Sequence, residues 1–117
     1  MFINKVFLTG RLTETPVLNH TNGTTPVPVC SFSIAVPREY SDKVDFVPIV
    51  AWREKAIFAC NYFKKGRRIL VEGSLQIKKR ELKDGTKRVF TEVVADNFDF
   101  MDYPTSYKTE TREVDNE

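Results

Sequence analysis

The sequence predicts an all-β domain of five strands with a single helix. Apolar residues alternate along several short segments, as in strands that have one buried face. The turn pairs Asn22-Gly23 and Asp84-Gly85 separate segments of this kind. Only residues 54–63 change to a helical period. A chain of 117 residues has room for one domain with its own core.

The first two strands are expected at residues 5–12 and 27–36. The first alternates around Val6, Leu8 and Leu12, and Gly10 stands where a bulge or tight bend would be tolerated. The second resumes the alternation after Asn22-Gly23, which indicates a hairpin-like reversal between the two.

A third strand is predicted at residues 45–52, and a helix follows it. Even spacing places Phe46 and Trp52 on the same side of the strand, whereas Pro48 indicates an edge or an irregularity. The helix is expected to bury one apolar stripe and to end at the C-cap glycine Gly66. This stripe comprises Ala56, Ile57, Ala59, Cys60 and Phe63.

The fourth strand is predicted at residues 69–77, with a glycine at its middle. A charged arm to Lys83, the Asp84-Gly85 turn and a fifth strand at residues 89–95 follow. A helix between the third and fourth of five strands is the order of an OB-fold, a partly open Greek-key barrel that binds oligonucleotides or oligosaccharides. We assign residues 1–101 to this domain and residues 102–117 to a polar, disordered tail.

Charge is unevenly distributed along the chain. The net charge is +2, but residues 102–117 carry five acidic and two basic residues, which leaves +5 on the body. Residues 64–88 alone hold ten Lys or Arg against three acidic residues. Such a segment either forms a solvated basic face or binds a polyanion.

Cys30 and Cys60 both fall on apolar sides of their elements, which favours core thiols in a reducing, cytoplasmic setting over a disulfide. No stretch of about 18 apolar residues is present, and the first residues lack the order of a secretion signal. We therefore expect no membrane association.

Four aromatic residues are candidates for a surface on which bases stack: Tyr40, Phe46, Trp52 and Phe90. Each of them could equally fill the core. Trp52 is the strongest candidate, because it is large and lies next to Arg53 where strand turns into helix.

Cations gather at the predicted strand ends and in the arm. The candidates for phosphate contacts are Lys5, Arg11, Arg38, Arg53, Lys78, Lys79, Arg80, Lys87 and Arg88. If several of these neutralise phosphates, binding should weaken steeply with salt.

Catalysis has little support in the sequence. His20 is the only histidine and lies in a turn region without a partner at ligand or triad spacing. The five glycines are scattered singly and form no phosphate loop. We predict neither an enzyme nor a cofactor or metal site.

Six segments, in order and at matching spacing, resemble the bacterial-type single-stranded DNA-binding proteins over about residues 2–101. They are Asn4-Lys5-Val6-Phe7-Leu8-Thr9-Gly10-Arg11-Leu12-Thr13, Asn22-Gly23, Phe32-Ser33-Ile34-Ala35-Val36, Asn61-Tyr62-Phe63-Lys64-Lys65-Gly66, Val71-Glu72-Gly73-Ser74-Leu75 and Thr91-Glu92-Val93-Val94-Ala95-Asp96. The resemblance implies an OB-fold, commonly a homotetramer, that coats single-stranded DNA in replication, recombination and repair. By position it implies stacking roles for Tyr40, Phe46 and Trp52.

Two positions and the tail depart from the family pattern. Arg80 stands where many members have a further aromatic, which replaces stacking by charge or by guanidinium contact with a base. Pro48 stands where a basic or polar residue is common. The tail lacks the long Gly- or Gln-rich linker with a terminal aromatic. This departure argues against recruitment of host repair enzymes through the tip of the tail. The shortened form resembles members carried by bacteriophages or mobile elements, which supply their own replication partners.

Two other functions fit the same residues. One is an OB-fold interaction module of a replication complex, with its aromatics in a subunit interface. The other is an RNA-binding relative, since stacking and charge alone do not distinguish ribose from deoxyribose.

Overall fold

The computed structural model describes residues 1–102 of the chain. The elements run in the order β1 (Val6–Leu12), β2 (Asn19–His20), β3 (Pro28–Pro37), β4 (Val44–Trp52), α1 (Glu54–Tyr62), β5 (Arg68–Glu81) and β6 (Lys87–Phe100). The five long strands and the helix match the predicted fold. The two-residue strand β2, which precedes the Asn22-Gly23 turn and pairs with the start of β3, was not predicted.

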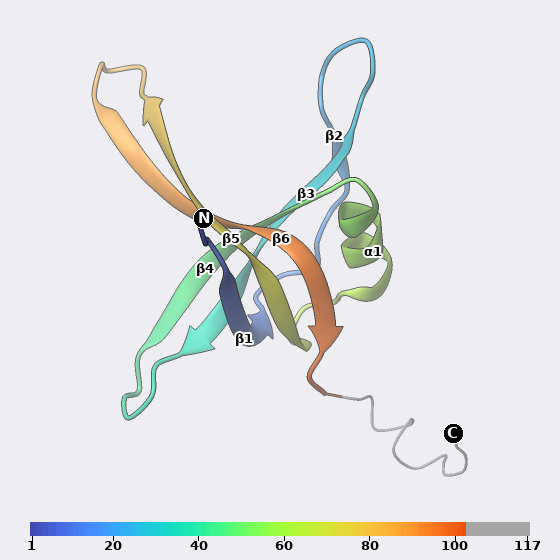
Figure 1. Cartoon of the computed structure of the whole chain (residues 1–117), viewed down its shortest axis with the longest axis vertical. Helices are drawn as coiled ribbons and strands as arrows, with labels where there is room; N and C mark the ends of the chain where they lie inside the picture. The colour runs from blue at the N-terminus through green and yellow to red at the C-terminus, as the bar shows by residue number, and fades with distance from the viewer. Residues whose placement is uncertain (103–117) are drawn as a thin grey trace.

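The sheet closes on itself into a barrel (Figure 1). Its strand order is β1-β5-β6-β4-β3-β2, and β1 also pairs with β3. That closing seam joins only Arg11 to Ala35 and Leu12 to Ile34. A second narrow seam joins β4 to β6, in parallel, at Ile49–Val93 and Val50–Val94. These short seams produce the partly open barrel of an OB-fold.

The barrel interior is filled by alternate residues of the strands and is capped by the helix region. Ile34, Ile49, Val71 and Val93 are fully buried. Phe63, directly after α1, is also buried and lies edge-on to the rings of Phe32, Phe58, Phe98 and Phe100. Edge-to-face rings of this kind add to the stabilisation from apolar burial.

Two details of the predicted helix are wrong. Ile57 is exposed, and Phe58 packs against the core in its place, because Ala56 and Ala59 set the buried face. Gly66 is not the C-cap: the helix ends at Tyr62, and the C-cap is Phe63 in an extended conformation. Gly66 instead forms a turn with φ of 91° and donates its N–H to the Leu12 carbonyl at 2.8 Å.

The charged arm is longer and more regular than predicted. The segment after Ile77 continues β5 to Glu81, and β6 begins at Lys87, so the two strands form a hairpin that projects from the barrel (Figure 1). Of the two features that Gly10 would tolerate, a bulge is not present there, since β1 pairs with β5 without interruption. The register shift lies between Glu72 and Gly73 instead.

The two cysteines are free thiols. Cys30 is buried on β3, and Cys60 is partly exposed on α1. Burial, together with the neighbouring Cys60, raises the pKa of the Cys30 thiol to about 12. Cys30 therefore stays protonated at neutral pH and acts as a small core residue, as the sequence predicts.

Of the predicted tail, only Asp102 falls among the described residues. Its carboxylate accepts a hydrogen bond from Arg67 Nε at 3.2 Å. The rest of that segment, residues 103–117, lies outside the described part of the chain.

Candidate nucleic-acid interface

The register of four strands places the candidate aromatics on one outer face of the barrel. On β4 the odd residues Ile49 and Ala51 point into the core, so the even residues Phe46 and Trp52 point outward. The parallel pair Val50–Val94 brings the even residues of β6, including Phe90, onto this same face. We call the surface of β3, β4, β6 and the arm that carries Phe46, Trp52 and Phe90 the aromatic face.

All three rings on the aromatic face are accessible. Phe46 is 67% exposed, Trp52 38% and Phe90 39%. An isolated exposed phenylalanine or tryptophan is unremarkable, but three on one outer face form a surface that suits the flat π-faces of unpaired bases.

Tyr40 lies apart from these rings, in the turn between β3 and β4. Its side chain is fully exposed, and its backbone has φ of 58°, which is uncommon for a residue other than glycine. No contact joins Tyr40 to the aromatic face within residues 1–102. The loop that carries it projects from the barrel, away from the arm (Figure 1).

The alternation of the arm divides the predicted cations into two groups. Lys78 lies opposite Phe90, and Arg80 lies opposite Arg88, so these three cations share the side of Phe90. The Arg80 guanidinium lies 5.2 Å from the centre of the Phe90 ring. Lys79 and Lys87 point to the other side of the arm.

Four of the predicted phosphate-binding cations have carboxylate partners, and one of them is Arg11, whose guanidinium lies 3.9 Å from Asp102. Lys5 Nζ lies 3.1 Å from Glu72, and Lys78 Nζ lies 2.8 Å from Glu92 Oε1, a buried oxygen with no other polar partner in the described chain. Arg38 binds both carboxylate oxygens of Asp45 and lowers the pKa of that carboxyl.

The Lys5–Glu72 and Arg38–Asp45 pairs lie at the surface, where such pairs are weak. A phosphate can therefore take the place of either carboxylate at small cost, whereas the buried oxygen of Glu92 would lose the only polar partner that the described residues give it. Arg38 is the cation for which this exchange is easiest, because the Arg38 and Asp45 side chains are each about half-exposed to solvent.

Arg53 occupies the sharp turn between β4 and α1, directly after Trp52. Its backbone has φ of 57° and ψ of −128°, and its N–H donates to the Pro28 carbonyl at 2.8 Å. Strained backbone of this kind persists only where the surroundings fix it. Arg53 is exposed and follows Trp52 directly in the chain, so the turn places a cation at the end of the aromatic face.

Sequence reasoning missed one cation, Arg68 at the start of β5. It lies opposite Arg11 across β1 and β5, and both line a cavity of about 430 Å³. The only available signal was the Arg67-Arg68 doublet, which contributed to the charge of its segment but to no predicted site. Its position beside Arg11 depends on pairing between distant strands.

Other kinds of site find no counterpart in the residues that the structure describes. Within residues 1–102, no group of three or more His, Cys, Asp or Glu side chains has a metal-binding arrangement. The single helix there, nine residues long, is too short to cross a bilayer.

Comparison with known proteins gives a consistent result. Residues 3–101 match the model of the single-strand binding protein family. The chain is 41% identical over 108 residues to single-stranded DNA-binding protein 3 of Clostridium acetobutylicum, covering 89% of this chain and 74% of that protein. It is 42% identical over 105 residues to the single-stranded DNA-binding protein of Clostridium tetani, covering 86% and 72%.

A third relative, the single-stranded DNA-binding protein of Caldanaerobacter subterraneus subsp. tengcongensis, is 42% identical over 105 residues, covering 86% of this chain and 69% of that protein. These relatives come from bacteria, and the bacteriophage or mobile-element origin stays a prediction. The barrel, the exposed rings and the family match over nearly the whole described chain lead to one conclusion: the chain belongs to the single-strand binding protein family.

Proposed function

We propose that the aromatic face binds single-stranded DNA without catalysis, with bases stacked on Phe46, Trp52 and Phe90. The observation that carries this proposal is the exposure of three rings on one face beside guanidinium groups. Each stacked base contributes on the order of 1 to 3 kcal/mol, and every base has a π-face, so binding depends little on sequence.

Phosphates would be held by the cations that flank the rings. Arg80 and Arg88 lie beside Phe90, and Arg53 lies beside Trp52. Lys78 would contact a phosphate while it stays paired with Glu92, whose buried oxygen has no other polar partner among residues 1–102. Lys79 and Lys87, on the reverse of the arm, would contact a strand that bends around it, and Tyr40 would receive a base only at the far end of the path.

Quenching of Trp52 fluorescence tests this proposal directly, because Trp52 is the only tryptophan. Oligothymidine should quench the emission, whereas a duplex of the same length should not. If Arg53, Arg80 and Arg88 each neutralise one phosphate, the logarithm of the affinity should fall with the logarithm of salt with a slope of about −2.

A flat salt response, or equal quenching by duplex, would contradict the proposed binding mode. Competition by a matched RNA strand distinguishes the RNA-binding alternative. If oligouridine displaces oligothymidine at equal concentration, the chain does not discriminate by sugar, and DNA is not its specific ligand.

We also propose that the chain self-associates as a homotetramer, in which β1 forms the contact between two of the copies. Over residues 6–10 this strand pairs with β5 on one side only, because its contact with β3 begins at Arg11. A strand edge with unpaired N–H and C=O groups is a template for another strand. Phe7, 62% exposed on β1, supplies apolar surface beside this edge.

Sedimentation equilibrium tests this assembly. The wild-type chain should sediment as a tetramer, and Leu8→Pro should lower the mass, because proline removes a backbone donor from the strand. Since Leu8 also packs on the core, Phe7→Lys provides a second variant that changes only an exposed side chain. A wild-type monomer at micromolar concentration would refute the assembly.

Roles in replication, recombination and repair, and contacts with proteins of those processes, follow from the same proposal. The names of the relatives support only the binding of single-stranded DNA, on which these roles depend. An interaction module whose aromatics are sealed in a subunit interface is less well supported, because Phe46 and Trp52 lie on β4, on the opposite flank of β3 from the free part of the β1 edge.

A further inference from the structure

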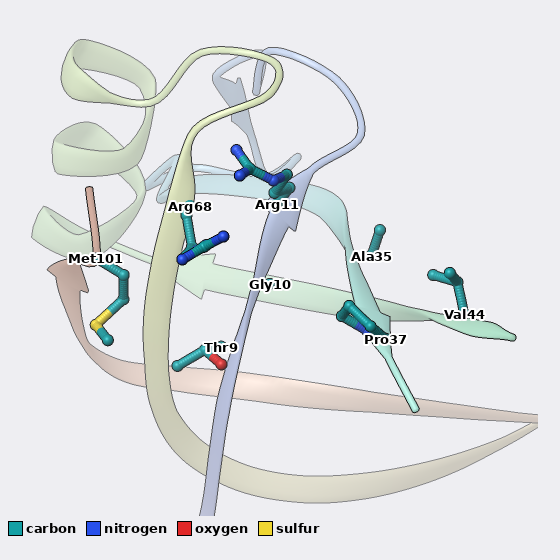
Figure 2. Close-up of a pocket in the computed structure, with 8 residues that line it drawn as sticks. All are labelled: Thr9, Gly10, Arg11, Ala35, Pro37, Val44, Arg68 and Met101. Atoms are coloured by element: carbon teal, nitrogen blue, oxygen red, sulfur yellow. The ribbon is translucent and has the colours of Figure 1, made fainter. Parts of the chain in front are cut away.

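A cavity of about 430 Å³ lies on the outside of the barrel where β1, β3 and β5 meet (Figure 2). Its volume is in the range of pockets that hold small organic groups. Arg11, Arg68 and the Thr9 hydroxyl line one part of it, and Ala35, Pro37 and Val44 line the other (Figure 2). The cavity therefore offers cations and apolar surface side by side.

The cavity is continuous with the aromatic face. Ala35 lies opposite Arg11 on β1 and opposite Phe46 on β4, so the three residues form one row across adjacent strands. Residues directly opposite in a sheet point to the same side, and neighbouring strands are about 5 Å apart. A polynucleotide that leaves the Phe46 ring along this row reaches the cavity after about 10 Å, which is two strand spacings.

The charges at the cavity are available to an anion. The Arg68 side chain has no ion pair or hydrogen bond among residues 1–102. The Arg11 guanidinium donates to the Gly66 carbonyl at 3.1 Å and lies 3.9 Å from Asp102. Asp102 is held more closely by the neighbouring Arg67, at 3.2 Å, so it leaves most of the positive charge at the cavity uncompensated.

We infer that this cavity holds one nucleotide of the single strand beyond Phe46. The guanidinium groups of Arg68 and Arg11 bind its phosphate, and its base or sugar lies against Pro37 and Val44. Arginine suits this role because its planar fork binds phosphate through two hydrogen bonds. The inference rests on the proposed function and extends it, since the bound strand then turns from the aromatic face around the barrel towards β1.

The test compares the full chain with Arg68→Gln and, as a matched loss of one positive charge on α1, Lys55→Gln. Oligothymidines of graded length are titrated while Trp52 quenching is recorded. For the shortest length that quenches, Arg68→Gln should bind like wild type. For longer strands it should bind about 10-fold more weakly, and its salt slope should be smaller by about 0.7.

Val44→Asp provides a second variant, since Val44 is 42% exposed and tolerates a polar side chain. The added carboxylate should reduce the affinity for long strands and leave the shortest strand unaffected, with an unchanged melting temperature. Lys55→Gln should show no length-dependent loss.

The possible contrary results are distinct. If wild type quenches normally but Arg68→Gln and Val44→Asp match it at every length, the nucleotide pocket is wrong while the aromatic face stands. If these variants alter only the sedimenting mass, the cavity is an interface between copies, and the inference is overturned. Failure of wild type to quench overturns the proposed function and this inference together.

Discussion

Replacing Phe46 and Trp52 together by alanine should weaken the binding of oligothymidine by about 30-fold or more. Both rings are exposed on the aromatic face, and each stacked base contributes about 1 to 3 kcal/mol. Loss of two stacking contacts therefore costs at least about 2 kcal/mol, and each 1.4 kcal/mol corresponds to a tenfold change in affinity. Because neither ring fills the core, the melting temperature should change little.

The double variant contains no tryptophan, so binding is measured by the fluorescence anisotropy of a labelled oligothymidine. Tyr62→Ala is the matched control, since Tyr62 is 56% exposed but lies on α1, outside the aromatic face. Its affinity should equal that of wild type. A double variant that binds as tightly as Tyr62→Ala would show that bases do not stack on this face.

Replacing Gly73 by alanine should lower the free energy of unfolding by more than about 3 kcal/mol. A Cβ atom there would overlap the Val94 carbonyl oxygen and lie 3.1 Å from the Ala95 Cα, both in the backbone of β6. Strands β5 and β6 would have to separate at the register shift, which lies at the base of the arm. Backbone displacement of this kind belongs among the most destabilising single substitutions.

Gly85→Ala is the comparison for this stability measurement. Gly85 has φ of 88° at the tip of the arm, and no heavy atom lies within 4 Å of a Cβ built there. Alanine at Gly85 should cost only about 1 to 2 kcal/mol, the strain of a left-handed residue. Urea denaturation curves of both variants give the two values, and equal costs would refute the crowding at Gly73.

The strands and the helix could be predicted because their signals are local. Alternation along the chain revealed the buried faces of β1, β3, β4 and β5, and a change of period revealed α1. The length of the arm could not be predicted this way, since residues 78–81 are exposed on both sides and carry no alternation. The position of the bulge could not be predicted, because Gly10 and Gly73 are both mid-strand glycines and only the pairing of β5 with β6 distinguishes Gly73.

The candidate site was partly predictable for a similar reason. Even spacing within one strand was enough to place Phe46 and Trp52 together. Phe90 joins them only through the pairing of β6 with β4, and the division of the arm cations depends on the β5–β6 register. The carboxylate partner of Lys5 is 67 residues away, so local pattern held no information about it.

The two narrow seams of the barrel have a further consequence. Each seam is joined by only two residue pairs, Arg11–Ala35 with Leu12–Ile34 and Ile49–Val93 with Val50–Val94. A polynucleotide that runs from Phe90 on β6 across β4, past Phe46, to Arg11 on β1 would cross both seams on the outside of the barrel. The bound DNA would then hold the two seams together, so local opening of the barrel at these seams should be less frequent with DNA bound than without it.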